Sequence, residues 1–187
     1  MVRITGGRLK GRQIVTAKGP HTRPTLAKTR KAIFDSLHCR YDLSRFEACD
    51  LFAGSGALGF EAYSRGVERV CFVEHNRRAI SLIRRNIVRL KLPATLHLVC
   101  EDAVHWLQSR SWQGRPILFL VDPPYKTDWI AKVVESLEEQ SHCLVGSLLV
   151  VETDRNHCIE YPTYFALFKQ KNFGRTRLDF VEILPRQ

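Results

Sequence analysis

A glycine-rich stretch at residues 50–59 constrains the fold of this chain more than any other feature of its sequence. An apolar run over residues 46–53 leads into three glycines spaced Gly-x-Gly-x-x-Gly, and a helical pattern begins at Ala57. A strand, a glycine turn and a helix start place free N–H groups and the positive helix end beside a ligand. Gly54 and Gly56 carry no Cβ, so the backbone can approach that ligand closely.

Strand and helix patterns alternate after this turn. Strand-like apolar runs are expected at residues 69–74, 95–100, 116–121 and 144–152. Helical patterns follow from Ala57, from an Asn76 cap, through Trp106 and Leu107, and from a Thr127 or Asp128 cap. This alternation predicts an α/β fold, with a mostly parallel sheet covered by helices on both faces. Two last runs, at 161–171 and 176–184, have no helix between them and predict an antiparallel hairpin at one edge of a seven-stranded sheet.

The positive charge is concentrated at the N-terminal end. Residues 1–45 hold eleven Lys and Arg against two acids, which gives +9, while residues 46–187 contribute +1 to the net charge of +10. This asymmetry indicates a polyanionic partner, although a solvated basic face would have the same composition. We therefore divide the chain into a basic extension, residues 1–45, and a main domain, residues 46–187.

The extension begins with a predicted hairpin. Short strands at residues 2–5 and 12–16 flank a turn rich in glycine and basic residues, and a helix should run from a Thr25 cap to about Cys39. The basic side chains that we expect to contact a polyanion are Arg3, Arg8, Lys10, Arg12, Arg23 and Lys28.

Composition limits the location of the protein. No apolar run approaches the ~20 residues that span a membrane, and the first residues lack the apolar core of a secretory signal. Six cysteines are scattered without a Cys-x-x-Cys pair, and Cys49, Cys71 and Cys100 are expected to be core thiols in a reducing compartment. We therefore predict a cytoplasmic protein, without metal or membrane partner, and a monomer.

Acidic residues stand at the ends of three predicted parallel strands. Glu74 ends the second, eighteen residues after Gly56, near the ~20-residue spacing of an acid that binds ribose hydroxyls. Asp102 follows the third strand and Asp122 the fourth. Because ligands bind beyond the carboxyl ends of such strands, three acids beside a glycine turn indicate a binding site. The glycine turn itself fits either a dinucleotide or S-adenosylmethionine (SAM).

The segment Asp122-Pro123-Pro124-Tyr125 distinguishes these possibilities. Two prolines fix the backbone and remove two N–H donors, so the Asp122 side chain and the Pro123 carbonyl remain as acceptors on a stiff arc. Tyr125 adds a flat stacking face. An exocyclic amino group on a base needs two acceptors and a stacking surface, so the segment predicts methylation of such an amine.

The sequence resembles a class I SAM-dependent methyltransferase of the amino-methylating kind. The segments Arg3-Ile4-Thr5-Gly6-Gly7, Gly11-Arg12, Arg23-Pro24-Thr25 and Arg30 with Phe34, together with residues 50–59 and 122–125, are similar to the RsmD family. This resemblance implies a Rossmann-like fold and methylation of guanine N2 in small-subunit (16S) ribosomal RNA, as naked RNA or within the small subunit.

The resemblance also implies roles for single residues. Gly54 and Gly56 would line the methionine part of SAM, Glu74 would bind the ribose, and Asp102 with the Ala103 backbone would bind the adenine. The full cofactor set that it implies is Asp50, Phe52, Gly54, Ser55, Gly56, Glu74, His75, Asp102 and Ala103. The catalytic set is Asp122, Pro123, Pro124 and Tyr125.

The sequence leaves three alternatives open. An adenine-N6 methyltransferase acting on DNA or RNA would carry the same tetrapeptide. A nicotinamide-dependent dehydrogenase would satisfy the glycine fingerprint and Glu74, but it gives residues 122–125 no role. An RNA-binding module without activity would not need the three strand-end acids.

Overall fold

A single sheet of seven strands, in the order β5-β4-β3-β6-β7-β9-β8, forms the centre of the molecule. The computed structural model describes residues 1–16, 24–124 and 128–186, and the side chains from residue 27 onward within the second range. The parallel strands are β3 (Glu47–Asp50), β4 (Val70–Val73), β5 (Leu96–Val99), β6 (Ile117–Val121) and β7 (Leu148–Asp154). The strands β8 (Phe165–Phe173) and β9 (Thr176–Ile183) form the antiparallel hairpin predicted at one edge, with β9 paired to β7.

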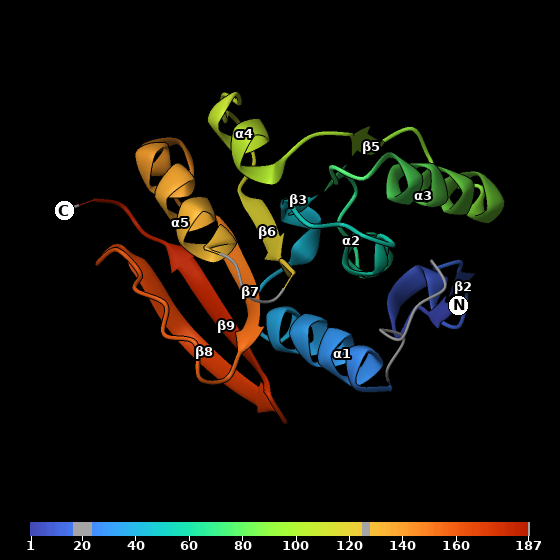
Figure 1. The fold of residues 1–187 in the computed structure, drawn as a ribbon, viewed down its shortest axis with the longest axis horizontal. Coiled ribbons are helices and arrows are strands. Elements are labelled where there is room, and N and C mark those ends of the chain that lie inside the picture. The colour runs from blue at the N-terminus through green and yellow to red at the C-terminus, as the bar shows by residue number, and fades with distance from the viewer. Residues whose placement is uncertain (17–23, 125–127, 187) are drawn as a thin grey trace.

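Helices cover both faces of this sheet, as the sequence predicts (Figure 1). The helices are α1 (Pro24–His38), α2 (Ala57–Ser64), α3 (Arg77–Leu90), α4 (Ala103–Gln108) and α5 (Trp129–Glu139). One core cluster joins α1, α2 and α3 to the sheet through Phe34, Phe60 and Ile83. The other joins α4 and α5 through Trp106 and Val133. Side chains from the extension therefore lie in the same core as the main domain.

The N-terminal segment forms a much smaller hairpin than the pattern indicates. Its strands β1 (Val2–Arg3) and β2 (Gln13–Ile14) have two residues each, and the 3-10 turn η1 (Gly7–Leu9) lies between them. Two further 3-10 turns, η2 (Leu43–Arg45) and η3 (Ser141–Cys143), precede β3 and β7.

A buried carboxylate on α2 holds this segment in place. Glu61 is fully buried and accepts hydrogen bonds from the Thr5 amide, the Thr5 hydroxyl (2.6 Å) and the Gly6 amide (2.9 Å). Its charge is balanced by Arg30 Nε at 3.6 Å and Arg65 Nε at 3.3 Å. A Cβ at Gly6 would lie 2.2 Å from Arg65 Nε, so any larger residue there would displace the Arg65 guanidinium from its contact with Glu61. Thr5, Gly6 and Arg30, which belong to segments similar to the RsmD family, therefore hold the extension against α2.

Three local predictions differ from the structure. Helix α1 begins at Pro24, a favourable first helical residue, so Thr25 lies inside the helix and is not its cap. Asp128 occupies the cap position of α5 but makes no side-chain cap hydrogen bond, while Thr127 lies outside the described residues. Cys100 is exposed, because the chain leaves the sheet after Val99, whereas Cys49 is buried and Cys71 half-buried. In the described parts of the chain no helix has the length and apolar character needed to cross a membrane.

Candidate active site

The carboxyl ends of β3, β4 and β6 lie next to one another and carry the acids selected from the sequence. We call this end of the parallel strands the rim. From β3 the chain passes to β4 on one side, while β6 lies on the other side of β3. The order of strands therefore reverses between β3 and β6, the place where ligands bind in sheets of this kind. Asp50 ends β3 and Asp122 follows β6, so these two acids flank the reversal point.

The three glycines have different roles in the turn between β3 and α2. Gly54 and Gly56 have φ angles of 52° and 79°, in the left-handed region that favours glycine. A Cβ at Gly56 would lie 2.8 Å from Phe60 and 3.1 Å from Phe72, and one at Gly59 would lie 2.3 Å from Phe72, so both glycines permit close packing of α2 on β4. At Gly54 the sole described atom within 4 Å would be the Phe52 carbonyl oxygen, at 3.9 Å. The backbone at Gly54 is therefore the part of the turn that a ligand can approach, and we call it the open side of the turn.

Asp50 stabilises this turn through a hydrogen bond to the start of α2. Its side chain is buried, and Oδ2 accepts a hydrogen bond from the Gly59 amide at 2.8 Å. Burial raises the pKa of Asp50 to about 7, the Gly59 hydrogen bond opposes this rise, and the charges of Asp122 and Glu74 add to it. Asp50 thus fixes the start of α2 and belongs to a cluster of acids that repel one another.

Glu74 joins the glycine turn to the next strand. Its Oε2 accepts from the Gly54 amide at 2.9 Å and its Oε1 from the Asn76 amide at 2.8 Å. His75 Nδ1 lies 3.1 Å from Oε1, and the His75 side chain is exposed. Asn76 caps α3 as predicted, because its side chain accepts from the Arg78 and Ala79 amides. Two backbone N–H donors therefore orient the Glu74 carboxylate, the group proposed to bind ribose.

Asp102 and Ala103 form the start of α4. Asp102 Oδ1 accepts from the Val104 amide at 3.0 Å and the His105 amide at 3.1 Å, so Asp102 is the N-cap of this helix. Ala103 is buried as the first helical residue. The cap places Asp102 beyond β5, on the same rim as Glu74.

The Asp-Pro-Pro segment continues directly from β6. Asp122 is half-buried, Pro123 is buried and Pro124 is exposed, while Tyr125 lies outside the described residues. Burial raises the pKa of Asp122 to about 6. A carboxyl group with a pKa near neutrality at the reversal point of the sheet can accept hydrogen bonds and exchange a proton.

Sequence reasoning missed two features of this rim. Val121 pairs with Val151 in register, so Glu152, the next residue of β7, lies beside Asp122. Glu152 is buried, and the strand-end rule that selected the other acids would also have selected it. The Phe52 ring lies 6.1 Å from the Trp129 ring in an edge-on arrangement, which places the start of α5 beside the glycine turn. Ser55 is half-buried in this turn.

The basic residues of the extension fall into two groups. Arg8 is held by the protein, because its guanidinium stacks 3.7 Å from the Tyr63 ring centre and donates to the Tyr63 and Val67 carbonyls. Four others are exposed and form no ion pair with any residue that the structure describes: Arg3, Lys10, Arg12 and Lys28. Arg23 lies outside the described residues.

Comparison with known proteins decides the family. The family described as Conserved hypothetical protein 95 matches residues 2–182. The chain belongs to this family. This is the RsmD family, to which the N-terminal segments and residues 122–125 are similar. Proteins named Ribosomal RNA small subunit methyltransferase D are among the relatives.

Individual relatives match over most of their length. The protein YlbH of Bacillus subtilis (strain 168) is 34% identical over 86% of each chain. The Ribosomal RNA small subunit methyltransferase D of Buchnera aphidicola (subsp. Acyrthosiphon pisum) is 30% identical, over 90% of this chain and 86% of the relative. Among solved structures, yhhF of Escherichia coli superposes with a TM-score of 0.85 and 25% identity over 99% of both chains. The architecture is thus the Rossmann-like class I methyltransferase fold predicted from the sequence.

Proposed function

We propose that this RsmD family member transfers a methyl group from SAM to the exocyclic N2 amine of a guanine in small-subunit ribosomal RNA. The observation that carries this proposal is the position of Asp122 and Pro123, immediately beyond β6 and beside the glycine turn that follows β3. Relatives named for methylation of small-subunit ribosomal RNA support the RNA substrate of this proposal.

The residues of the rim fit SAM as the methyl donor. SAM supplies a methyl group bonded to a positively charged sulfur. Asp50, Glu74 and Asp122 lie near one another at the rim. Burial raises the pKa of Asp50 and of Asp122, and the charges of Asp122 and Glu74 raise the pKa of Asp50 further. A nearby cation relieves such strain, so this acidic rim favours a positively charged ligand. Gly54 leaves room for close approach, and Glu74 is held where a ribose hydroxyl could donate to it.

Asp122 and Pro123 would act on the acceptor amine. The lone pair of guanine N2 is delocalised into the ring, so the amine is a weak nucleophile. Hydrogen bonds from its two N–H groups to the Asp122 carboxylate and the Pro123 carbonyl would favour a pyramidal nitrogen and stabilise its developing positive charge. Asp122, with a pKa of about 6, can also receive the proton that the nitrogen loses. Positioning of the two reactants supplies much of the remaining acceleration.

The substrate base must leave its stack to reach this rim. Tyr125 is proposed to stack on the extruded base, and Lys10, Arg12 and Lys28 to bind backbone phosphates without reading the base. Arg3 and Arg23 complete this proposed phosphate set, whereas the contacts of Arg8 favour a structural role in docking η1. In this division, residues 1–45 hold the RNA and residues 46–187 carry out the transfer.

Methylation in vitro tests the reaction and its base. Purified protein, SAM and small subunits from cells that lack the protein are incubated, and the ribosomal RNA is digested to nucleosides for mass spectrometry. Formation of N2-methylguanosine supports the proposal. Formation of N6-methyladenosine instead would establish the alternative that the same Asp-Pro-Pro segment allows.

A further inference from the structure

Helix α3 presents a strongly basic outer face that the proposed catalytic site does not use. Its fourteen residues include five arginines and no acid. The exposed arginines are Arg77, Arg78, Arg84, Arg85 and Arg89. The opposite face carries Ile80, Ile83 and Leu90 into the core, so the arginines face solvent for the whole length of the helix. From Arg77 to Arg89, a separation of twelve residues, this face extends for about 18 Å.

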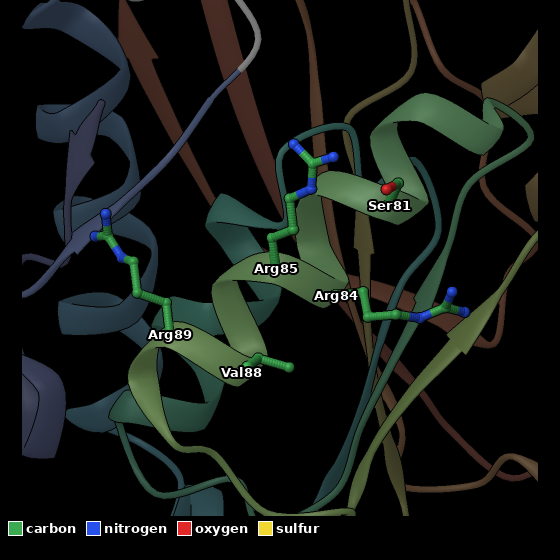
Figure 2. Close-up of a pocket in the computed structure, with 5 residues that line it drawn as sticks. All are labelled: Ser81, Arg84, Arg85, Val88 and Arg89. Carbon is green, nitrogen blue, oxygen red and sulfur yellow. The ribbon is translucent and has the colours of Figure 1, made fainter.

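A shallow depression of about 430 Å³ lies on this face. Figure 2 shows its lining: Ser81, Arg84, Arg85, Val88 and Arg89, with the three guanidinium groups spreading away from the helix in different directions. Val88 is 72% exposed and forms an apolar patch between the arginines. Arginine guanidinium groups bind phosphate oxygens through paired N–H donors, and an apolar side chain between them can contact the ribose that links two phosphates.

The charges on α3 are not neutralised within the part of the chain that the structure describes. None of the five arginines lies within 4.0 Å of a described carboxylate, although other arginines of this protein form such pairs. Arg77 and Arg78 stand in the first helical turn, where the helix dipole disfavours positive charge, and Arg85 and Arg89 repel each other at an i,i+4 spacing. These arrangements weaken the helix slightly, and an external anion would offset the repulsion.

The basic face connects the two regions already assigned to the substrate. Helix α3 starts two residues after the Glu74–His75 rim, at the Asn76 cap. Farther along, the buried Asn86 side chain exchanges two hydrogen bonds of 2.9 Å with the Val15 backbone, and Arg89 donates to the Gln13 carbonyl. Figure 1 shows β2 beside α3. The exposed arginines of α3 therefore lie between the rim and the N-terminal segment.

We propose that the outer face of α3 binds backbone phosphates of the small-subunit ribosomal RNA, at a segment apart from the target base. This inference rests on the proposed function, because it assumes that ribosomal RNA is the substrate. Arg84 and Arg85 bind phosphate oxygens through paired N–H donors, Ser81 adds a hydroxyl donor, and Val88 contacts ribose. The charge asymmetry in the sequence does not reveal this surface, because acids elsewhere in residues 46–187 cancel the arginines in the total.

The test compares two variants that each lose two positive charges. Arg84→Gln with Arg85→Gln removes the centre of the basic face and leaves Arg89 on Gln13. Lys169→Gln with Lys171→Gln is the matched control on β8, the strand at the opposite edge of the sheet from β5. Filter binding to transcribed small-subunit ribosomal RNA, and to assembled small subunits, is measured over a salt series, with SAM calorimetry and melting temperature on the same samples.

We expect the α3 variant to bind the RNA about tenfold more weakly, with the log–log salt slope reduced by about 1.4 for two lost contacts. SAM affinity and melting temperature should match the control, and the control should bind RNA like the unmodified protein. Equal RNA affinity and salt slope in the two variants would overturn the proposal. So would normal binding to naked RNA with a loss confined to assembled subunits, because the face would then contact a ribosomal protein. If the unmodified protein methylates no ribosomal RNA, the proposed function fails, which is a separate result.

Discussion

The Glu74 carboxylate accepts a hydrogen bond from the Gly54 amide at 2.9 Å, across twenty residues of sequence. One oxygen thus ties the end of β4 to the open side of the glycine turn, while the other is held by the Asn76 amide. The acid proposed to bind the SAM ribose also shapes the surface that SAM approaches. Loss of Glu74 should therefore affect binding in two ways.

Substitution of Glu74 separates these two contributions. Glu74→Gln keeps an oxygen that can accept from Gly54 but loses the charge, whereas Glu74→Ala loses both. We expect SAM affinity to fall by roughly 10-fold in the glutamine variant and by roughly 100-fold in the alanine variant, from one or two lost charge-assisted hydrogen bonds. Calorimetry with SAM checks this, with NAD as a control ligand. Equal affinity in all three proteins, or tight NAD binding, would contradict the assigned site.

Asp122→Ala should separate binding from transfer. Because Asp122 is proposed to act on the acceptor amine, SAM affinity should change little while the transfer rate falls by roughly 100-fold or more. Single-turnover methylation measures the rate and calorimetry the affinity. Near-normal turnover in this variant would remove Asp122 from the mechanism.

The pH dependence of the reaction should report the same carboxyl group. With a pKa of about 6, Asp122 is protonated in acid and cannot act as a charged acceptor. The transfer rate should therefore rise as the pH increases through about 6 and level off above about 7. A single-turnover pH profile that is flat between about pH 5 and pH 8 would argue against a titrating acceptor at this position.

Asp50 should affect stability in a pH-dependent way. Its pKa is about 7 in the folded protein and about 4 in an unfolded chain, so the folded state binds the proton more tightly. Raising the pH from about 4 to about 7 should therefore lower the free energy of unfolding, relative to an Asp50→Asn variant, by on the order of 1 to 4 kcal/mol. Urea denaturation of both proteins over this pH range measures the difference. A constant difference would show that Asp50 does not titrate there.

The docking of the N-terminal segment depends on Glu61. Glu61→Gln leaves Arg30 buried without its charge partner, and breaking such a pair costs about 3 kcal/mol. Asp35→Asn is the control: Asp35 pairs with Arg65 at 2.9 Å, but its side chain is 40% exposed, so its loss should cost less than about 1 kcal/mol. Urea denaturation compares the two variants. Similar losses in both would show that the Glu61 cluster does not hold the fold.

Local signals in the sequence predicted much of this structure. The Asn76 cap, the helix start after Gly56 and the acids after each strand depend on neighbouring residues, so they could be recognised directly. Long-range pairing could not. Glu61 meets Thr5 across 56 residues, and charge alone predicts Arg8 as an RNA contact, whereas in the fold its guanidinium stacks on Tyr63. The position of the α3 arginines next to the N-terminal segment likewise depends on long-range contacts, such as that between Asn86 and Val15.

The most direct test of the central proposal is the modification state of ribosomal RNA in cells. Small-subunit RNA is isolated from cells with and without this protein, and from deleted cells that express either the unmodified protein or Asp122→Ala. Digests are compared by mass spectrometry. We expect one N2-methylguanosine to disappear on deletion, to return with the unmodified protein, and to stay absent with Asp122→Ala. An unchanged N2-methylguanosine content in deleted cells, or the loss of a methylated adenine in its place, would contradict the account.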